Sequence, residues 1–119
     1  MEISIKHKGK ILKLEAGECG VFKKGIGLMF RSKNTENLLF PFSSDVRISI
    51  HSFFVFFPFL AVWLDGENRV MELKIVRPFT MVIRPKKKFR KLVELPLNNK
   101  NTRIVDFLVG KERFKYSGD

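Results

Sequence analysis

The sequence predicts an all-β protein, an antiparallel β-sandwich or barrel with at most one short helix. Three observations lead to this fold class. Apolar and polar residues alternate in many short stretches, turn-forming residues separate these stretches, and a single stretch offers a site for a helix. Such a pattern is typical of sandwiches and barrels. The chain has 119 residues, and we expect residues 1–119 to form one domain.

The beginning of the chain predicts a β-hairpin. Residues 2–8 and 10–15 alternate, and Gly9 lies between them in a tight turn. Residues 16–27 are the one plausible helix site, but they contain four glycines. Each glycine costs up to about 1 kcal/mol relative to alanine in a helix interior. A short apolar strand is expected at residues 38–42.

The centre of the chain carries twelve consecutive apolar residues, Phe53 to Leu64. The run is too short for a membrane helix, which needs about 20 residues, and its aromatic and β-branched residues favour strands. Pro58 cannot donate to a strand ladder and divides the run. We therefore expect one strand that begins at Asp45 and ends near Phe57, and another at residues 59–64. The second strand is apolar on both faces, which predicts a central strand with layers above and below it.

The rest of the chain predicts more short strands. Residues 65–68 form a turn, and residues 69–76 supply the returning arm of a hairpin. Further strands are predicted at residues 79–84, 89–95 and 103–109, with a weaker candidate at 113–116.

Composition indicates a basic protein of the cytoplasm. The net charge is +11, and the N-terminal residues alternate like a strand and lack the apolar segment of a signal peptide. One cysteine, Cys19, excludes an internal disulfide and suits a reducing compartment. Glutamine is absent and lysine is abundant, a composition that leans towards a thermophilic source.

Charge is concentrated at the two ends of the chain. Residues 1–33 carry a net +5, residues 34–83 a net −1, and residues 84–119 a net +7. These ends form one basic surface if they are neighbours in space, and two if they are not. The densest part, residues 84–91, is called the basic segment here, and its cations are Arg84, Lys86, Lys87, Lys88, Arg90 and Lys91.

The basic segment has two interpretations. Clustered lysine and arginine release counterions from a polyanion, so the segment could contact phosphates. It could equally be a solvated loop whose lysines keep an edge strand from pairing with other chains. Only Phe89 is interleaved for base stacking, and no known nucleic-acid-binding motif occurs.

No catalytic or metal-binding constellation is visible, and no cofactor is implied. His51 could act as a base or a ligand, but no carboxylate or second histidine is near it in the sequence. Two scattered histidines and Cys19 do not have the spacing of a metal site. The acidic residues are spread singly, so no carboxylate pair suggests acid–base catalysis.

Five segments follow one another in this order: Gly27-Leu28-Met29-Phe30-Arg31, Leu38-Leu39-Phe40-Pro41-Phe42, His51-Ser52-Phe53-Phe54, a hydrophobic strand that closes on Asp65-Gly66 with Arg69-Val70 after it, and Leu92-Val93-Glu94-Leu95-Pro96. In this order they resemble an uncharacterised family, number 192 among the domains of unknown function. The resemblance covers about residues 2–110. It implies an antiparallel, jelly-roll-like β fold with a short helix before Gly27, and no established activity.

This chain departs from the family pattern after His51-Ser52-Phe53. Where many members carry polar residues of the type Lys-Asn-Thr, this chain continues Val55-Phe56-Phe57-Pro58. If those polar residues form a site in relatives, this protein lacks it. Arg31 and His51 are the polar positions that match the family.

Two functional hypotheses follow. The first is a non-enzymatic binding domain whose basic surface takes an anionic partner: RNA, an acidic protein or an anionic small molecule. The alternative is a small-ligand or enzyme site in a sandwich pocket near Arg31 and His51, which requires these two side chains to lie close together. A surplus of phenylalanine over what the core can hold would in addition form an apolar patch suited to a homo-oligomer.

Overall fold

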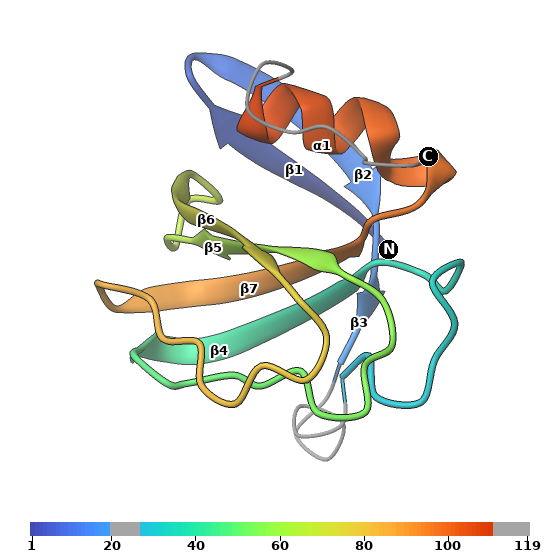
Figure 1. The fold of residues 1–119 in the computed structure, drawn as a ribbon. Helices are drawn as coiled ribbons and strands as arrows, with labels where there is room; N and C mark the ends of the chain where they lie inside the picture. Colours follow the sequence, from blue (N-terminus) through green and yellow to red (C-terminus); the bar gives the residue numbers. More distant parts are fainter. Residues whose placement is uncertain (20–26, 111–119) are drawn as a thin grey trace.

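The computed structural model describes residues 1–19 and 27–110 of the chain. Within these ranges the protein is mostly β, as predicted, with one α-helix and two sheets (Figure 1). Neither sheet closes on itself, so the predicted sandwich or barrel is not confirmed. The described part has no helix with the length and apolar character needed to cross a bilayer.

The predicted N-terminal hairpin is present as a separate two-stranded sheet. Strands β1 (Glu2–His7) and β2 (Lys10–Glu15) pair antiparallel in unbroken register, from Glu2 opposite Glu15 to His7 opposite Lys10. Lys8 and Gly9 both have positive φ, at 50° and 77°. A two-residue turn of this kind matches the right-handed twist of the strands it joins.

The larger sheet has five strands in the order β3-β4-β7-β5-β6. Its members are β3 (Gly17–Glu18), β4 (Leu38–Val46), β5 (Phe59–Leu64), β6 (Val70–Val76) and β7 (Phe89–Pro96). Only β3 and β4 pair parallel; the other neighbours are antiparallel. The predicted hairpin around residues 65–68 is confirmed as β5–β6.

The prediction of a central strand buried on both faces is confirmed by β5. All six of its residues are buried, and it pairs with β6 on one side and β7 on the other. Leu60, Val62 and Leu64 pack into one core cluster, and Phe59, Ala61 and Trp63 pack into a second. The sheet therefore has a core on each face.

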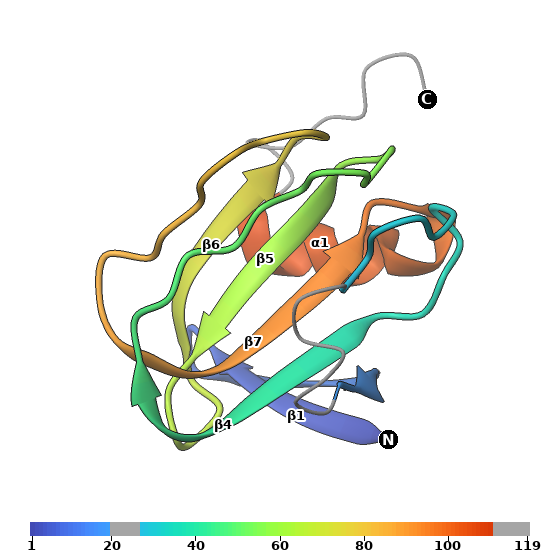
Figure 2. The ribbon, with the colours of Figure 1, turned by 90° about the horizontal axis from the view of Figure 1, so that it is seen from below.

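Different kinds of structure cover the two faces of the sheet. The first core is completed by the β1–β2 hairpin and by helix α1 (Thr102–Val109), which contributes Val105 and Leu108. The second is covered by two irregular segments, residues 47–58 and 77–88, which supply Val55, Phe57 and Ile83. Figure 2 shows both segments on the side of the sheet away from α1.

The prediction of strands in these irregular segments was wrong. Strand β4 ends at Val46, and residues 47–57 and 79–84 make a single bridge, between Ile50 and Ile83. Ser52, fully buried, joins the segments instead: its hydroxyl donates to Arg77 O at 2.6 Å and accepts from Thr80 N–H at 2.6 Å. Hydrogen bonds from the side chain and backbone of one buried serine thus take the place of a continuous ladder between the two segments.

The strand predicted at residues 103–109 was also wrong, because this segment is α1. A 3₁₀ turn, η2 (Asn99–Asn101), leads into the helix, and Gly110 ends it at φ 84° with its N–H on Asp106 O. Val105 and Leu108, three positions apart, are the buried residues of the helix, which is helical spacing. Most of the expected helix site at 16–27 and the weaker strand candidate at 113–116 lie outside the described residues.

Candidate functional site

The six cations of the basic segment lie on two kinds of structure. Arg84, Lys86, Lys87 and Lys88 are exposed in the irregular segment before β7, whereas Arg90 and Lys91 are half-buried on β7. No carboxylate in the described part of the chain forms an ion pair with Lys86, Lys87 or Lys88. These three ammonium groups are therefore available to an anionic partner.

Other residues of the basic segment fix it to the sheet. The Nε of Arg90 donates to Asp45 Oδ1 at 3.0 Å, and the N–H of Lys86 donates to Glu72 Oε1 at 2.9 Å. The buried Pro85 accepts from Arg47 Nε at 2.9 Å. Phe89, which the sequence offered for base stacking, is 1% exposed and packs edge-on against Trp63. The segment thus presents charge but no exposed ring.

The two basic ends of the chain meet at Asn68, in the β5–β6 turn. Asn68 O accepts from the N–H of Lys6 at 2.9 Å, and Asn68 Oδ1 accepts from Lys91 Nζ at 2.6 Å. Asn68 adopts φ 64°, a left-handed conformation that asparagine tolerates better than most residues. One turn therefore links the N-terminal hairpin to β7 and makes the two basic regions neighbours.

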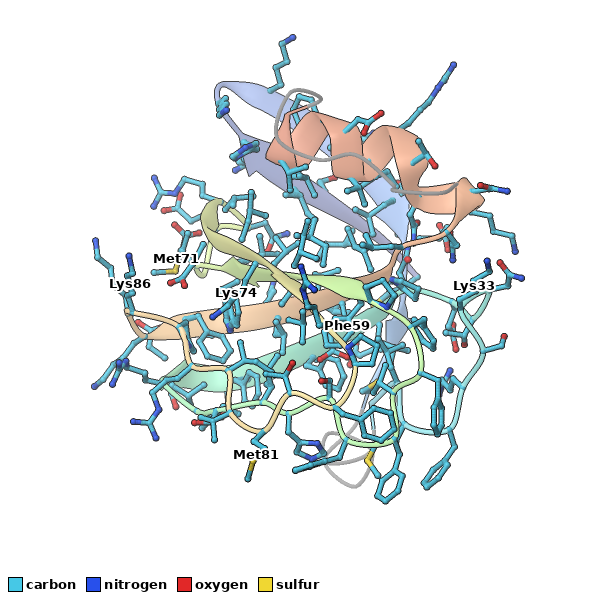
Figure 3. All side chains as sticks on the ribbon, in the orientation of Figure 1. Lys33, Phe59, Met71, Lys74, Met81 and Lys86 are labelled. Carbon is cyan, nitrogen blue, oxygen red and sulfur yellow. The ribbon has the colours of Figure 1, made fainter. Side chains whose placement is uncertain are left out.

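The basic residues gathered around these turns are together called the basic edge here. The β1–β2 turn, the β5–β6 turn and the segment before β7 all lie along the left side of the molecule in Figure 1, where Figure 3 labels Lys86. The basic edge comprises Lys6, Lys8, Lys10, Arg47, Arg69, Arg84, Lys86, Lys87, Lys88, Arg90 and Lys91. Four acidic side chains lie among them, Asp45, Asp65, Glu67 and Glu72, so cations exceed anions by seven.

Arg31, one residue of the alternative pocket, is engaged elsewhere. Its Nη1 donates to Thr35 Oγ1 at 3.2 Å and lies 3.5 Å from Glu36 Oε2. Arg31 is not among the residues that line a pocket with His51. The structure therefore does not bring the two predicted pocket residues to a common cavity.

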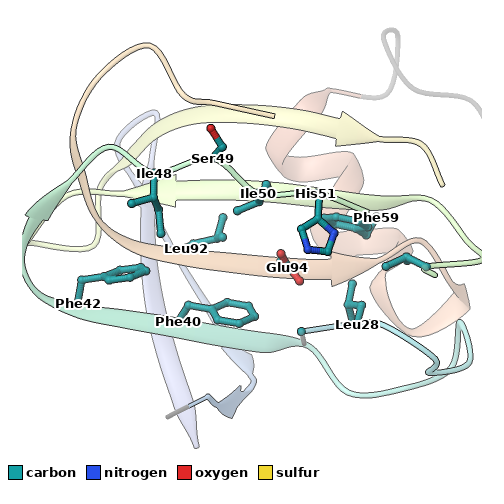
Figure 4. A pocket seen from close by; sticks show the side chains of 12 residues that line it. Leu28, Phe40, Phe42, Ile48, Ser49, Ile50, His51, Phe59, Leu92 and Glu94 are labelled. Carbon is teal, nitrogen blue, oxygen red and sulfur yellow. The ribbon is translucent and has the colours of Figure 1, made fainter. Parts of the chain in front are cut away.

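His51 does border a cavity, which lies between the sheet and the segment 47–58 (Figure 4). Its volume is about 120 Å³. Most of its walls are apolar, formed by Leu28, Phe40, Phe42, Ile48, Ile50, Val55, Phe59 and Leu92. His51 is exposed at the border, and its Nδ1 accepts from the N–H of Phe53 at 3.2 Å.

The carboxyl group inside this cavity belongs to Glu94, which the sequence reasoning missed. Glu94 lies on β7 between β4 and β5, with the buried Leu38 and Ala61 as its cross-strand partners. It is 6% exposed, and burial raises the pKa of its carboxyl to about 8. The one available signal was a glutamate within the apolar run Leu92–Leu97 of a strand.

An exposed apolar patch lies apart from the basic edge. It consists of Phe30, Phe54, Phe56 and Phe79, which are 46–69% exposed. The rings of Phe30 and Phe54 stack at 5.0 Å, and Phe79 packs edge-on against Phe54 and Phe56. Phe30, Phe54 and Phe79 have φ between 58° and 62°, where a bulky residue is strained. Part of the phenylalanine surplus therefore lies at the surface.

In the part of the chain that the structure describes, the fold and its surfaces define a class of protein: a small, mostly β domain with a basic edge and an apolar cavity that contains one carboxyl. Within residues 1–19 and 27–110, no three His, Cys, Asp or Glu side chains are grouped so that they could hold a metal ion.

The chain belongs to the UPF0127 family, which is uncharacterised. A UPF0127 protein of Pyrococcus horikoshii is 32% identical over 87 residues, which are 71% of this chain and 74% of the relative. A UPF0127 protein of Pyrococcus abyssi is 27% identical over 95 residues, 79% of this chain and 77% of the relative. No family model matches the chain, so membership of the family numbered 192 is not confirmed.

Solved structures share the fold at low sequence identity. A protein of unknown function from Novosphingobium aromaticivorans has a TM-score of 0.71 and 13% identity, and the match covers 87% of this chain and 77% of that one. A candidate transcription regulator from Sinorhizobium meliloti also has a TM-score of 0.71, with 15% identity. That match covers 86% of this chain and 82% of the other. At these identities the likeness shows the fold alone.

Proposed function

We propose that this protein is a non-enzymatic binding domain whose basic edge takes an extended polyanion, for which RNA is the leading candidate. The observation that supports the proposal is the junction at Asn68, where one turn is hydrogen-bonded to Lys6 of the hairpin and to Lys91 of β7, from two separate basic regions of the sequence. A surface spanning several turns suits a long, multiply charged partner better than a single small anion.

The mode of binding follows from the chemistry of the exposed groups. Lys86, Lys87 and Lys88 offer point charges to phosphates, and their neighbour Phe89 is buried. Without an exposed ring in the segment, base stacking does not contribute there, and contacts with the backbone dominate. We therefore expect binding that depends strongly on salt and weakly on sequence.

The test removes the three free lysines together. Wild-type protein and the triple variant Lys86→Ala, Lys87→Ala, Lys88→Ala are titrated against a fluorescent single-stranded RNA at about 50 mM and about 200 mM salt. Each phosphate contact contributes roughly −0.7 to the slope of log affinity against log salt, so losing three contacts should make the slope less negative by about 2.

A matched control separates position from net charge. The variant Lys33→Ala, Lys100→Ala, Arg103→Ala also removes three exposed cations, none of which belongs to the basic edge. It should leave the affinity within about twofold of wild type. If both triple variants lost the same amount of RNA affinity, net charge and not the position of the lysines would explain the binding. Absence of RNA binding at low salt would refute the RNA proposal, and an acidic protein or small anion would then be the ligand to titrate.

The alternative of an enzyme site at Arg31 and His51 has less support. Arg31 pairs with Glu36, and His51 borders a different space. What remains of that alternative is the cavity itself, whose chemistry is set by Glu94.

A further inference from the structure

The strongest unexplained group in the described structure is the carboxyl of Glu94. It lines the cavity beside His51 and is 94% buried, since 6% of its surface is exposed. Its strand is flanked by β4 and β5, so the side chain lies over the interior of the sheet, on the face that carries the cavity. Figure 4 shows its oxygens between Phe40, Phe59 and the His51 ring.

Glu94 has no hydrogen-bond partner among the residues that the structure describes. None of the side-chain and backbone hydrogen bonds involves its carboxyl, and it belongs to no ion pair. Among the described residues, the fully buried side-chain atom without a partner is the indole nitrogen of Trp63, so the Glu94 oxygens keep accessible surface toward the cavity and can take a partner there. A ligand that hydrogen-bonds to the carboxyl would supply the missing partner.

The ionisation of Glu94 restricts the charge of that ligand. Burial raises the pKa of the carboxyl to about 8, so the group is mainly neutral at pH 7. A neutral carboxyl presents an O–H donor next to a C=O acceptor. The matching group carries an acceptor next to a donor and no charge, as in an amide. A cation is disfavoured further by the net charge of +11.

The size and walls of the cavity restrict the rest of the ligand. An engineered apolar cavity of about 150 Å³ in another protein binds benzene, and this cavity measures about 120 Å³. Its space suits a single ring or a group of similar size. Phe40, Phe42 and Phe59 offer aromatic surfaces for the body of that ring.

We propose that this cavity is a binding site for a small uncharged molecule about one ring in size, whose adjacent C=O and N–H groups pair with the Glu94 carboxyl. The site is independent of the basic edge and goes beyond the proposed function. Its ligand class is that of cyclic amides and of heterocycles with an amide-like edge. Glu94 is the residue that determines specificity, and the phenylalanines hold the ring.

The test uses three probes of one size: 2-piperidone (a neutral ring amide), piperidine (a cation at neutral pH) and benzene (apolar). Each is titrated into ¹⁵N-labelled protein at pH 6.5, and amide shifts are followed. We expect 2-piperidone to bind with a millimolar dissociation constant, as a ligand of this size should. The shifts should be confined to residues around the cavity, such as Phe40 and Leu92.

Two substitutions of Glu94 separate hydrogen bonding from shape. Glu94→Gln keeps a donor and an acceptor, so its dissociation constant for 2-piperidone should stay within about threefold of the wild-type value. Glu94→Leu has a side chain of similar size but removes both the donor and the acceptor. It should lower the affinity for 2-piperidone roughly tenfold, the loss expected for one hydrogen-bond pair. The affinity for benzene should not change. Ile48→Trp, at a half-exposed position of the cavity wall, should weaken every probe by narrowing the space.

Three outcomes overturn the proposal. One is that piperidine binds more tightly than 2-piperidone, which would assign the site to a cation. Another is that benzene and 2-piperidone bind equally and Glu94→Leu changes neither. The last is that no probe shifts residues around the cavity at millimolar concentration, in which case the space holds water alone. Dispersed spectra of all variants serve as the check on folding.

Discussion

Glu94 occupies a position where every residue near it on the strand is apolar and buried. Leu92, Val93 and Leu95 are each at most 2% exposed, and a carboxyl among them loses its hydration. The consequence for stability has a definite sign. The folded state holds the proton more tightly than the unfolded state, because the pKa of Glu94 is raised from 4.5 to about 8. Stability associated with this group is fully present below pH 4.5 and is lost as pH rises towards 8.

The first residue-scale prediction concerns Glu94→Gln, whose side chain does not ionise. Between about pH 4.5 and pH 8 the stability of the variant relative to wild type should rise with pH, by up to about 1.4 kcal/mol per pH unit. Denaturant unfolding at a series of pH values measures the difference. His51, the other titratable side chain of the cavity wall, is present in both proteins.

Glu2→Gln provides the control for this measurement. Glu2 is exposed at the start of β1, so its substitution should leave the pH profile of stability parallel to that of wild type. A Glu94→Gln profile that also runs parallel to wild type would show that Glu94 is ionised normally in the folded protein.

At the scale of elements, regular strands were predictable and irregular ones were not. Strands β1, β2, β5 and β7 follow from alternation or from apolar runs bounded by turns, because ladder pairing repeats the same local pattern. Segments 47–58 and 77–88 carry similar residues but lie across the sheet face without a ladder. Nothing in their local pattern distinguishes a residue buried under a loop from one buried in a strand.

Helix α1 shows how propensity misled the prediction. Residues 103–109 contain Ile104, two valines and Phe107, which favour strands. Packing against the first core overrides this preference, since one face of α1 presents Val105 and Leu108 to the sheet. Gly110, directly after the helix, was the signal in the sequence that a helix ends there.

The element-scale prediction concerns Ser52, which holds the two irregular segments together. Ser52→Ala removes a buried hydroxyl that makes two hydrogen bonds of 2.6 Å and leaves its partners, Arg77 O and Thr80 N–H, with one bond fewer. We expect a loss of about 1–3 kcal/mol in the free energy of unfolding, measured by denaturant titration.

Ser44→Ala is the matched control, because Ser44 is exposed on β4. The free energy of unfolding of this variant should stay within about 0.5 kcal/mol of the wild-type value. If Ser52→Ala proved equally mild, the two segments would be held by apolar packing and by the backbone hydrogen bonds of Ile50 and Ser52, and the His51-Ser52 motif would need another explanation.

At the scale of the whole molecule, the surface divides into regions of different character. Cations gather at the turns that make the basic edge, where Figure 3 labels Lys86, and the ring contacts of Phe30, Phe54, Phe56 and Phe79 make an apolar patch elsewhere. The sequence predicted a phosphate-binding segment and a surplus of phenylalanine. It could not predict that the two basic ends meet, because that depends on one backbone bond and one side-chain bond at Asn68.

The apolar patch leads to a prediction about assembly. If copies associate through it, Phe30→Ser with Phe56→Ser should weaken association at least tenfold, because two rings that are 62–69% exposed would lose buried contact. Light scattering over a concentration series measures the average mass. Ile11 and Met71 are exposed apolar residues outside the patch, so Ile11→Ser with Met71→Ser should leave the average mass at each concentration as in wild type. A wild-type protein that stays monomeric at high concentration removes the oligomer hypothesis.

Trp63 has a consequence for observing this protein. It is the single tryptophan of the chain, it is fully buried on β5, and its indole N–H has no acceptor among the described residues. Its intrinsic fluorescence therefore reports on one place, the layer where β5 meets Phe89. Emission should be at short wavelength in the native state and move to longer wavelength when water reaches the ring. Unfolding around the middle of the sheet can thus be followed without a label.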